Sequence, residues 1–215
     1  MNDERLQGQL AARLFLYTVF QSLMGSAPTA RMLDGIDAEL VAASFEELGL
    51  EAPEGFVSLL SSGIDIEKLS GEYTRCFEGP ARLPSPVWET VHVTGEASIF
   101  QTLTLEVRNA YRSQGFLPKL YPSVADDHIA LELDFLRALA GRACSAAESG
   151  DMAACKSSLQ ASRQFLDDHL SRWAGSYARQ LVDSKASDFY GSAATALAEL
   201  VERDVGLLAE LCEKR

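Results

Sequence analysis

Two short segments of the sequence combine carboxylates with histidines, the side chains that often hold cationic groups. Glu89 and His92 stand three residues apart, which places them on one face of a helical turn. Asp126, Asp127 and His128 are consecutive. A carboxylate here could accept hydrogen bonds from a guanidinium fork, and a neighbouring imidazole could orient that carboxylate or bond a peptide backbone. Both segments are therefore candidates for binding an arginine side chain.

The same residues allow two other interpretations. If the segments meet, Glu89, His92, Asp127 and His128 could together hold a metal ion, as in a metal-binding or hydrolytic helical protein. Asp126 could instead begin a long helix, because Asp is a favoured N-cap residue and a second acid in the first turn complements the helix dipole.

Trp88 follows a segment that must be a loop, since residues 79–87 contain three prolines and a glycine. A tryptophan after such a loop is either a core residue or one wall of a groove that receives an apolar helix. In the second case Pro86, Glu72 and Tyr73 are candidates to line the same groove.

Motifs of enzymes are missing from the sequence. It has no phosphate loop, no glycine-rich dinucleotide fingerprint and no nucleophile elbow. The three histidines, at 92, 128 and 169, accompany no recognisable nucleophile. The sequence therefore predicts no catalytic residue, no metal site and no cofactor of the protein's own.

Helical periodicity dominates the elements that must position these residues. Aspartates at 37, 65, 126 and 151 are the expected N-caps of four helices, and another helix is expected after Pro53. The remaining helices are expected over about 6–24, from near Gly95 to Gln114, over 173–181, and from Asp188 to near the end. The sequence contains Asp-Asp-His twice, at 126–128 and 167–169, without alignment of the flanking residues. The pattern predicts an all-α fold, a single helical bundle of about ten helices, with residues 1–215 as one domain.

Composition and charge restrict the partners. The net charge of −12 repels a nucleic-acid backbone and favours basic partners, or it simply keeps the protein soluble. The four cysteines form no C-x-x-C pair, which favours a reducing compartment. The acidic start, Met1 to Arg5, is unlike a secretory signal, and the most apolar stretch, Leu14 to Phe20, is too short to span a bilayer. We expect a cytoplasmic protein without an integral membrane segment.

Three segments in order carry a family resemblance. They are Gly71 to Pro80 with Pro84 to His92, then Ala125 to Leu136, then Phe165 to Trp173, followed by the aromatic pair Phe189 and Tyr190. Together they resemble the TorD/DmsD family of redox-enzyme maturation chaperones over roughly residues 5–205. Thr90 replaces the serine usual after the glutamate, and Ala125 stands where the family usually has proline before the Asp-His pair.

The resemblance implies a chaperone rather than an enzyme. Its expected partner is the precursor of a molybdopterin oxidoreductase, whose twin-arginine leader peptide it would bind while the cofactor is inserted and export is held back. It also implies an all-helical, TorD-like fold, a monomer or domain-swapped homodimer, and a capacity to bind guanine nucleotide or the molybdopterin cofactor that no motif here locates. An alternative is an assembly factor that binds the folded client without the leader.

The expected peptide-binding residues are Glu72, Tyr73, Pro86, Trp88, Glu89, His92, Asp126, Asp127 and His128. This set requires that Trp88 to His92 and Asp127 to His128, far apart in the chain, meet along one cleft. The leader's apolar segment would then pack on Trp88, while its arginines meet Glu89 and Asp127.

Overall fold

The computed structural model describes residues 3–79, 81–96, 102–118 and 124–213. Its helices are α1 (Asp3–Gly25), α2 (Ala30–Asp34), α3 (Ala38–Glu47), α4 (Glu54–Ser61), α5 (Ile66–Tyr73), α6 (Glu89–Thr94), α7 (Thr102–Ser113), α8 (Ile129–Glu148), α9 (Met152–Asp168), α10 (Ala174–Ser184) and α11 (Asp188–Glu213). A π-helical turn, η1 (Thr74–Glu78), continues α5, and a 3₁₀ turn, η2 (Leu170–Arg172), follows α9. Within the described residues the only β-type pairing is one isolated bridge. The predicted all-α fold is confirmed.

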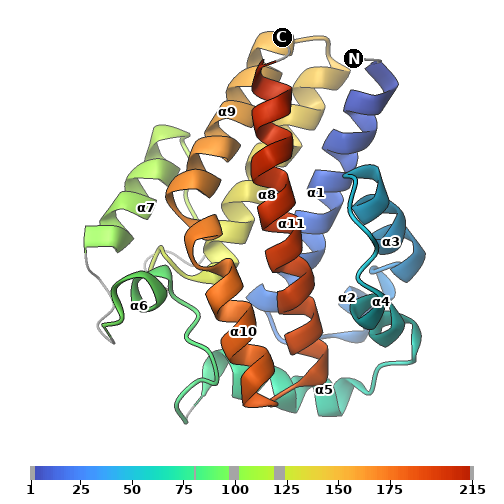
Figure 1. Cartoon of the computed structure of the whole chain (residues 1–215), viewed down its shortest axis with the longest axis vertical. Helices are drawn as coiled ribbons and strands as arrows, with labels where there is room; N and C mark the ends of the chain where they lie inside the picture. The colour runs from blue at the N-terminus through green and yellow to red at the C-terminus, as the bar shows by residue number, and fades with distance from the viewer. Residues whose placement is uncertain (1–2, 80, 97–101, 119–123, 214–215) are drawn as a thin grey trace.

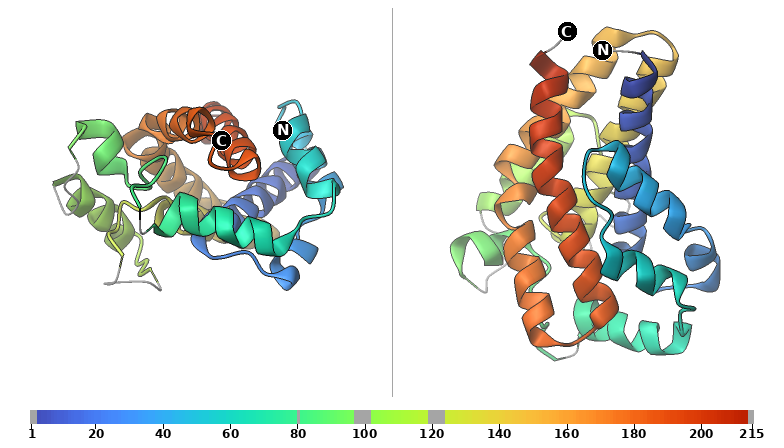
Figure 2. Two further views of the ribbon diagram at one scale, coloured as in Figure 1. Left: turned by 90° about the horizontal axis from the view of Figure 1, so that it is seen from below. Right: turned by 45° about the vertical axis from the view of Figure 1, so that its right-hand side comes forward.

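Four long helices make the body of the molecule. Helix α1 packs along α8, α8 along α9, and α9 along α11, while α10 packs on the first half of α11. Helix α1 begins and α11 ends at the same end of the bundle, and α5 crosses the opposite end (Figure 1). Helices α6 and α7 lie outside the bundle, on the side away from α3 and α4, as both views of Figure 2 show.

The buried apolar side chains form one continuous cluster that draws on nearly every helix. Burial of such surface is the dominant favourable contribution to folding. The four cysteines are free thiols. The single domain over residues 1–215 stays a prediction. No helix in the described part of the chain is long and apolar enough to cross a membrane.

A buried ion pair joins the first and last helices. Arg13 in α1 donates to both carboxylate oxygens of Asp204 in α11, over 2.6 and 3.0 Å, and the Tyr17 hydroxyl donates to the same carboxylate over 2.7 Å. None of these side chains is exposed to solvent. Two parallel hydrogen bonds fix the relative position of α1 and α11 more narrowly than apolar contacts would.

Most predicted helix beginnings are confirmed. The carboxylates of Asp37, Asp65 and Asp151 accept hydrogen bonds from the first backbone N–H groups of α3, α5 and α9. The prediction that Asp126 is the N-cap of α8 is wrong. His128 is the N-cap instead, with its Nδ1 accepting from the Ala130 N–H over 3.1 Å.

The helix expected from near Gly95 does not include Gly95 itself. Gly95 adopts φ of 74°, in the left-handed region that favours glycine, and so ends α6. The described part of the following helix, α7, begins at Thr102. Ile99, expected on its inner face, and the loop prolines Pro80 and Pro122 lie outside the described residues.

Candidate functional site

The two segments that the sequence singled out meet side by side. Trp88 and His128 form the isolated antiparallel bridge, with the Glu89 N–H donating to the Asp127 carbonyl and the Ile129 N–H to the Val87 carbonyl, each over 2.9 Å. The bridge brings the first turn of α6 against the first turn of α8. The two segments therefore meet, and a peptide-binding cleft along them stays a prediction.

Asp127 lies at the centre of this junction. Its Oδ2 accepts from the Thr90 N–H and its Oδ1 from the Thr104 hydroxyl, both over 3.1 Å, and the residue is fully buried. The carboxylate therefore caps α6 from outside that helix and fastens α7 to the junction. This differs from the expectation that Asp127 presents a free carboxylate to a ligand arginine.

Asp126 already holds an arginine of the same chain. The Arg108 guanidinium lies 2.7 Å from the Asp126 carboxylate, and the Tyr111 hydroxyl donates to the Asp126 carbonyl over 2.8 Å. Both Arg108 and Tyr111 come from α7. Asp126, which is 1% exposed, therefore joins α7 to the beginning of α8.

Trp88 and His128 form the partly accessible face of the junction, which we call the Trp88–His128 face. Both residues are half-buried, and their rings pack edge to face with centroids 5.9 Å apart. Burial lowers the pKa of His128 to about 4, so its ring is neutral at physiological pH and can serve as the acceptor that caps α8.

His92 and Pro86 fix the proline-containing loop to the bundle. The His92 Nε2–H donates to the Pro86 carbonyl over 2.7 Å, and the Ser176 hydroxyl lies 3.3 Å from Nδ1. The His92 ring stacks on Trp173 with centroids 5.2 Å apart. Burial lowers the pKa of His92, which favours its neutral form.

Glu72 and Tyr73 belong to a different part of the molecule. The Glu72 carboxylate accepts a hydrogen bond from the Ser187 hydroxyl over 2.5 Å and lines a separate cavity of about 220 Å³ between α5 and the beginning of α11. Tyr73 is buried against Phe77 and Tyr190. The structure does not bring either residue to the Trp88–His128 face.

Glu89 is paired with His169, a residue for which we predicted no separate role from the sequence. The His169 Nδ1 lies 3.0 Å from Glu89 Oε2, while Glu89 Oε1 is buried without a hydrogen-bond partner. Burial raises the pKa of Glu89, and the hydrogen bond from His169 opposes that rise. Glu89 therefore has no exposed surface with which to meet a ligand directly. The sequence feature that pointed to His169 is its place in the segment Phe165 to Trp173, the third segment of the family resemblance.

Glu132 is a second buried acid in this region. Its Oε2 accepts from the Trp173 indole N–H over 3.3 Å, and its Oε1 has no partner. Burial first, and then the nearby Glu89, raise the pKa of Glu132 well above its usual range. Buried acids with raised pKa values gather at functional sites more often than elsewhere.

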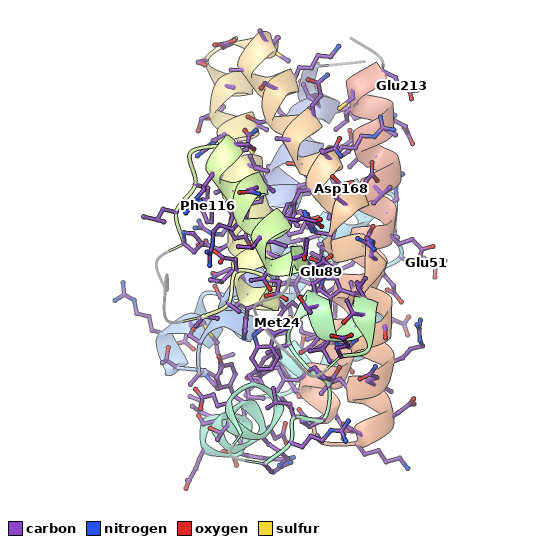
Figure 3. The ribbon with its side chains drawn as sticks, turned by 90° about the vertical axis from the view of Figure 1, so that its left-hand side faces the viewer. Met24, Glu51, Glu89, Phe116, Asp168 and Glu213 are labelled. Atoms are coloured by element: carbon purple, nitrogen blue, oxygen red, sulfur yellow. The ribbon has the colours of Figure 1, made fainter. Side chains whose placement is uncertain are left out.

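A cavity of about 480 Å³ opens between α7 and α9, and we call it the α7/α9 groove. Figure 3 shows its side of the molecule, with Asp168 at the end of α9 and Glu89 at the beginning of α6, beside α7. The lining residues are Glu106, Asn109, Ala110, Ser113, Gln114, Phe135, Ala161, Gln164, Phe165, Asp168, His169 and Arg172. The Glu89–His169 pair connects this groove to the Trp88–His128 junction.

The alternative metal site is not formed. Among the described residues, which include all four proposed ligands, no group of three or more His, Cys, Asp or Glu side chains could hold a metal ion. His92 points to the Pro86 carbonyl and His128 caps α8, so neither ring is directed at the carboxylates of Glu89 and Asp127.

Three curated proteins are similar to this chain. A "Probable Tat proofreading chaperone DmsD" from Haemophilus influenzae is 26% identical over 62% of this chain and 58% of its own length. The chaperone protein TorD of Vibrio cholerae is 33% identical over 41% of this chain and 39% of its own. The Tat proofreading chaperone DmsD of Salmonella typhi is 29% identical over 58% of this chain and 54% of its own. The matched part thus spans less than two thirds of each relative.

These similarities confirm the resemblance to TorD and DmsD proteins. The family model described as nitrate reductase delta subunit matches residues 50–179. That range contains the Trp88–His128 face and every residue of the α7/α9 groove. Because the match covers more than half of the 215 residues, the chain belongs to the nitrate reductase delta subunit family.

Proposed function

We propose that this protein is a cytoplasmic maturation chaperone, not an enzyme, that binds the twin-arginine leader of a molybdopterin oxidoreductase precursor. The names of the curated relatives, Tat proofreading chaperone and TorD, support this role. The structural observation that carries it is the junction at which Trp88 and His128 are half-buried beside each other. The leader's apolar segment packs on this face.

The physical argument rests on the nature of the two rings. Trp88 offers a large apolar surface, and the neutral His128 ring adds a flat side with little desolvation cost. An amphipathic peptide helix that covers both rings removes apolar surface from water on each partner. The buried Asp126 and Asp127 do not contact the peptide in this arrangement, because they hold α6, α7 and α8 in place around the face.

The net charge of −12 affects how fast the leader associates with the protein, rather than the contacts in the bound complex. An acidic surface attracts a leader that carries arginines and speeds its association, and salt weakens this attraction. We expect association to slow as ionic strength rises, with a smaller change in dissociation.

The test is titration of a fluorescent twin-arginine leader peptide against the wild type and Trp88→Ala. We expect Trp88→Ala to weaken binding by about tenfold or more, the range for a central interface tryptophan. Leu40→Ala is the matched control, since Leu40 is an exposed apolar residue on α3, on the other side of the bundle. Equal affinity of Trp88→Ala and the wild type for the leader, measured on folded protein, would show that the leader does not bind on the Trp88–His128 face.

A second candidate is an assembly factor that binds the folded client without its leader. The description of the matching family, a nitrate reductase subunit, favours this alternative. A client enzyme prepared with and without its leader distinguishes the two. A leader-dependent chaperone loses most of its binding when the leader is removed, whereas an assembly factor keeps it.

A further inference from the structure

His169 carries a ring nitrogen to which no described residue forms a hydrogen bond. The residue follows the last turn of α9, is 5% exposed and lines the α7/α9 groove. Its Nδ1 is engaged by Glu89, and Nε2 has no hydrogen-bond partner among the described residues. A ring nitrogen without a protein partner on a nearly buried side chain that lines a cavity is a position where a ligand can form a hydrogen bond.

The tautomer of His169 decides whether the ligand group beside Nε2 is a hydrogen-bond donor or an acceptor. In the tautomer that carries its hydrogen on Nδ1 and donates it to the Glu89 carboxylate, the lone pair of Nε2 is directed away from Glu89. Such a nitrogen accepts a hydrogen bond. The ligand group beside it is therefore a donor.

The charges around the groove favour a cation. Glu89 lies directly behind His169, with its Oε2 3.0 Å from the ring nitrogen Nδ1. Glu106 and Asp168 add carboxylates to the groove lining, where Arg172 is the only lysine or arginine. Arg172 donates to the main-chain carbonyl of Asp168. The acids outnumber the bases, so a positively charged donor is attracted into the groove.

The groove walls favour a flat cation over a compact one. Phe135 and Phe165 form the buried floor of the groove, 1% and 2% exposed, with ring centroids 4.8 Å apart, and the Phe165 ring lies 4.9 Å from the ring of His169. Side-chain amides of Asn109, Gln114 and Gln164 also line the groove. A flat guanidinium group donates several hydrogen bonds in its plane and can bond several of these oxygen acceptors at once, whereas an ammonium group is a compact point charge.

From these observations we infer that the α7/α9 groove binds an arginine side chain of the leader peptide, with the guanidinium donating to His169 Nε2 and to Asp168. This inference rests on the proposed function and adds a site that lies apart from the Trp88–His128 face. Asp168 accepts from Gln164 through Oδ2, and its Oδ1 has no partner among the described residues. Glu89 acts through His169 as a positioning residue.

The two sites are compatible with one peptide. Trp88 and Glu89 are consecutive in the chain, and Glu89 contacts His169 at the groove. A leader with its apolar segment on Trp88 can therefore place a neighbouring arginine in the groove without a long span of chain.

The chain provides its own probes, because it has three histidines, at 92, 128 and 169. Protein labelled with ¹⁵N at the histidine rings is titrated with a twin-arginine leader peptide, the same leader with two lysines, and the dipeptide acetyl-Arg-Arg-amide. His169 reports on the groove and His128 on the Trp88–His128 face. His92, fixed to Pro86 and Trp173, is the internal reference.

We expect the Nε2 signal of His169 to shift with the leader and with the arginine dipeptide, and to shift much less with the lysine leader. If the leader shifts the ring signals of His128 and leaves those of His169 unchanged, the assignment of the groove is wrong and the proposed function is retained. If the dipeptide shifts the His169 signal while the leader does not shift the His128 signal, the groove assignment is supported and the proposed Trp88–His128 face is wrong. If neither signal moves at saturating leader, both proposals are wrong.

Affinities of variants give the second measurement. Asp168→Asn and His169→Asn should each weaken leader binding by about tenfold, the scale of losing a hydrogen bond to a charged group. The Asn amide of His169→Asn can still donate to Glu89, so the variant removes Nε2 with little loss of stability. Asp167→Asn is the matched control, because Asp167 is the exposed neighbour on α9 and does not line the groove. Equal losses for Asp167→Asn and Asp168→Asn would show that net charge alone is responsible and would overturn the assignment.

Discussion

Glu89, Asp127 and Glu132 are acids inside the protein, although the first two were expected to meet an arginine from outside. Each is fully buried. Asp127 is satisfied by Thr90 and Thr104, whereas Glu89 and Glu132 each keep one oxygen without a partner. A buried oxygen without a hydrogen-bond partner destabilises the folded protein. Buried acids of this kind are found more often at functional sites than elsewhere.

Replacing Glu132 with glutamine should stabilise the protein at neutral pH. The pKa of Glu132 is raised in the folded state, so the folded protein holds a proton that the unfolded chain releases above the ordinary carboxyl pKa. Stability contributed by this group therefore falls as pH rises from about 4 towards the raised pKa. The variant avoids that fall while keeping an oxygen for the Trp173 N–H.

The measurement is urea unfolding of the wild type and Glu132→Gln from pH 4 to pH 8. We expect the two to be alike near pH 4 and the variant to be about 1–3 kcal/mol more stable at pH 8. Glu199→Gln, at an exposed position of α11, controls for the change in net charge. A difference that is the same at both ends of the pH range would contradict the assignment of a raised pKa.

At the scale of elements, Asp127 holds three helices together. It caps α6 through the Thr90 N–H, reaches α7 through the Thr104 hydroxyl, and directly precedes the residue that caps α8. The role needs oxygen atoms in position and does not need the negative charge. This distinguishes a structural acid from one that pairs with a ligand.

Two substitutions separate these roles. Asp127→Asn keeps an oxygen for Thr90 and presents an amide N–H to the Thr104 oxygen, so we expect leader affinity to change by less than about twofold. Asp127→Ala leaves both partners unsatisfied and should destabilise the fold by about 1–3 kcal/mol. Leader titration and thermal unfolding of both variants check this. A large loss of affinity in a stable Asp127→Asn would instead show that the charge itself binds the leader.

The sequence predicted those features of the elements that depend on near neighbours. Asp37, Asp65 and Asp151 were recognised as N-caps because each stands just before an apolar helical pattern. It could not assign Asp127 or Glu89, since their partners Thr104 and His169 lie 23 and 80 positions away. Asp126 was misassigned for the same reason, because Arg108 in α7 holds its carboxylate. The α7/α9 groove forms only when helices distant in sequence pack together.

At the scale of the whole molecule, the ion pair of Arg13 with Asp204 closes the bundle between its first and last helices. Asp204→Ala leaves the Arg13 guanidinium buried without its counter-charge and should cost about 3–5 kcal/mol in the free energy of unfolding. Glu202→Ala, at an exposed position of the same helix, should change it by less than about 0.5 kcal/mol. Similar urea midpoints for both variants would show that the Arg13–Asp204 ion pair does not stabilise the bundle.

The bundle presents the leader with two surfaces on one side, the Trp88–His128 face and the α7/α9 groove, connected by the buried Glu89–His169 pair. Helices α6 and α7 form this side, while α1, α8, α9 and α11 provide the rigid body behind it (Figure 1). The acidic net charge favours arrival of a basic peptide at any face, so only local contacts can decide where it stays.

Photo-crosslinking of a leader fused to a carrier protein tests the central claim most directly. One fusion has a photoreactive residue in the leader's apolar segment and a second has it beside the twin arginines; mass spectrometry identifies the labelled positions. We predict that the first labels the neighbourhood of Trp88 and His128 and the second labels α7 or the end of α9. Labels confined to α3 or to the α10 and α11 surface, or labelling equal to that of the carrier alone, would contradict the account.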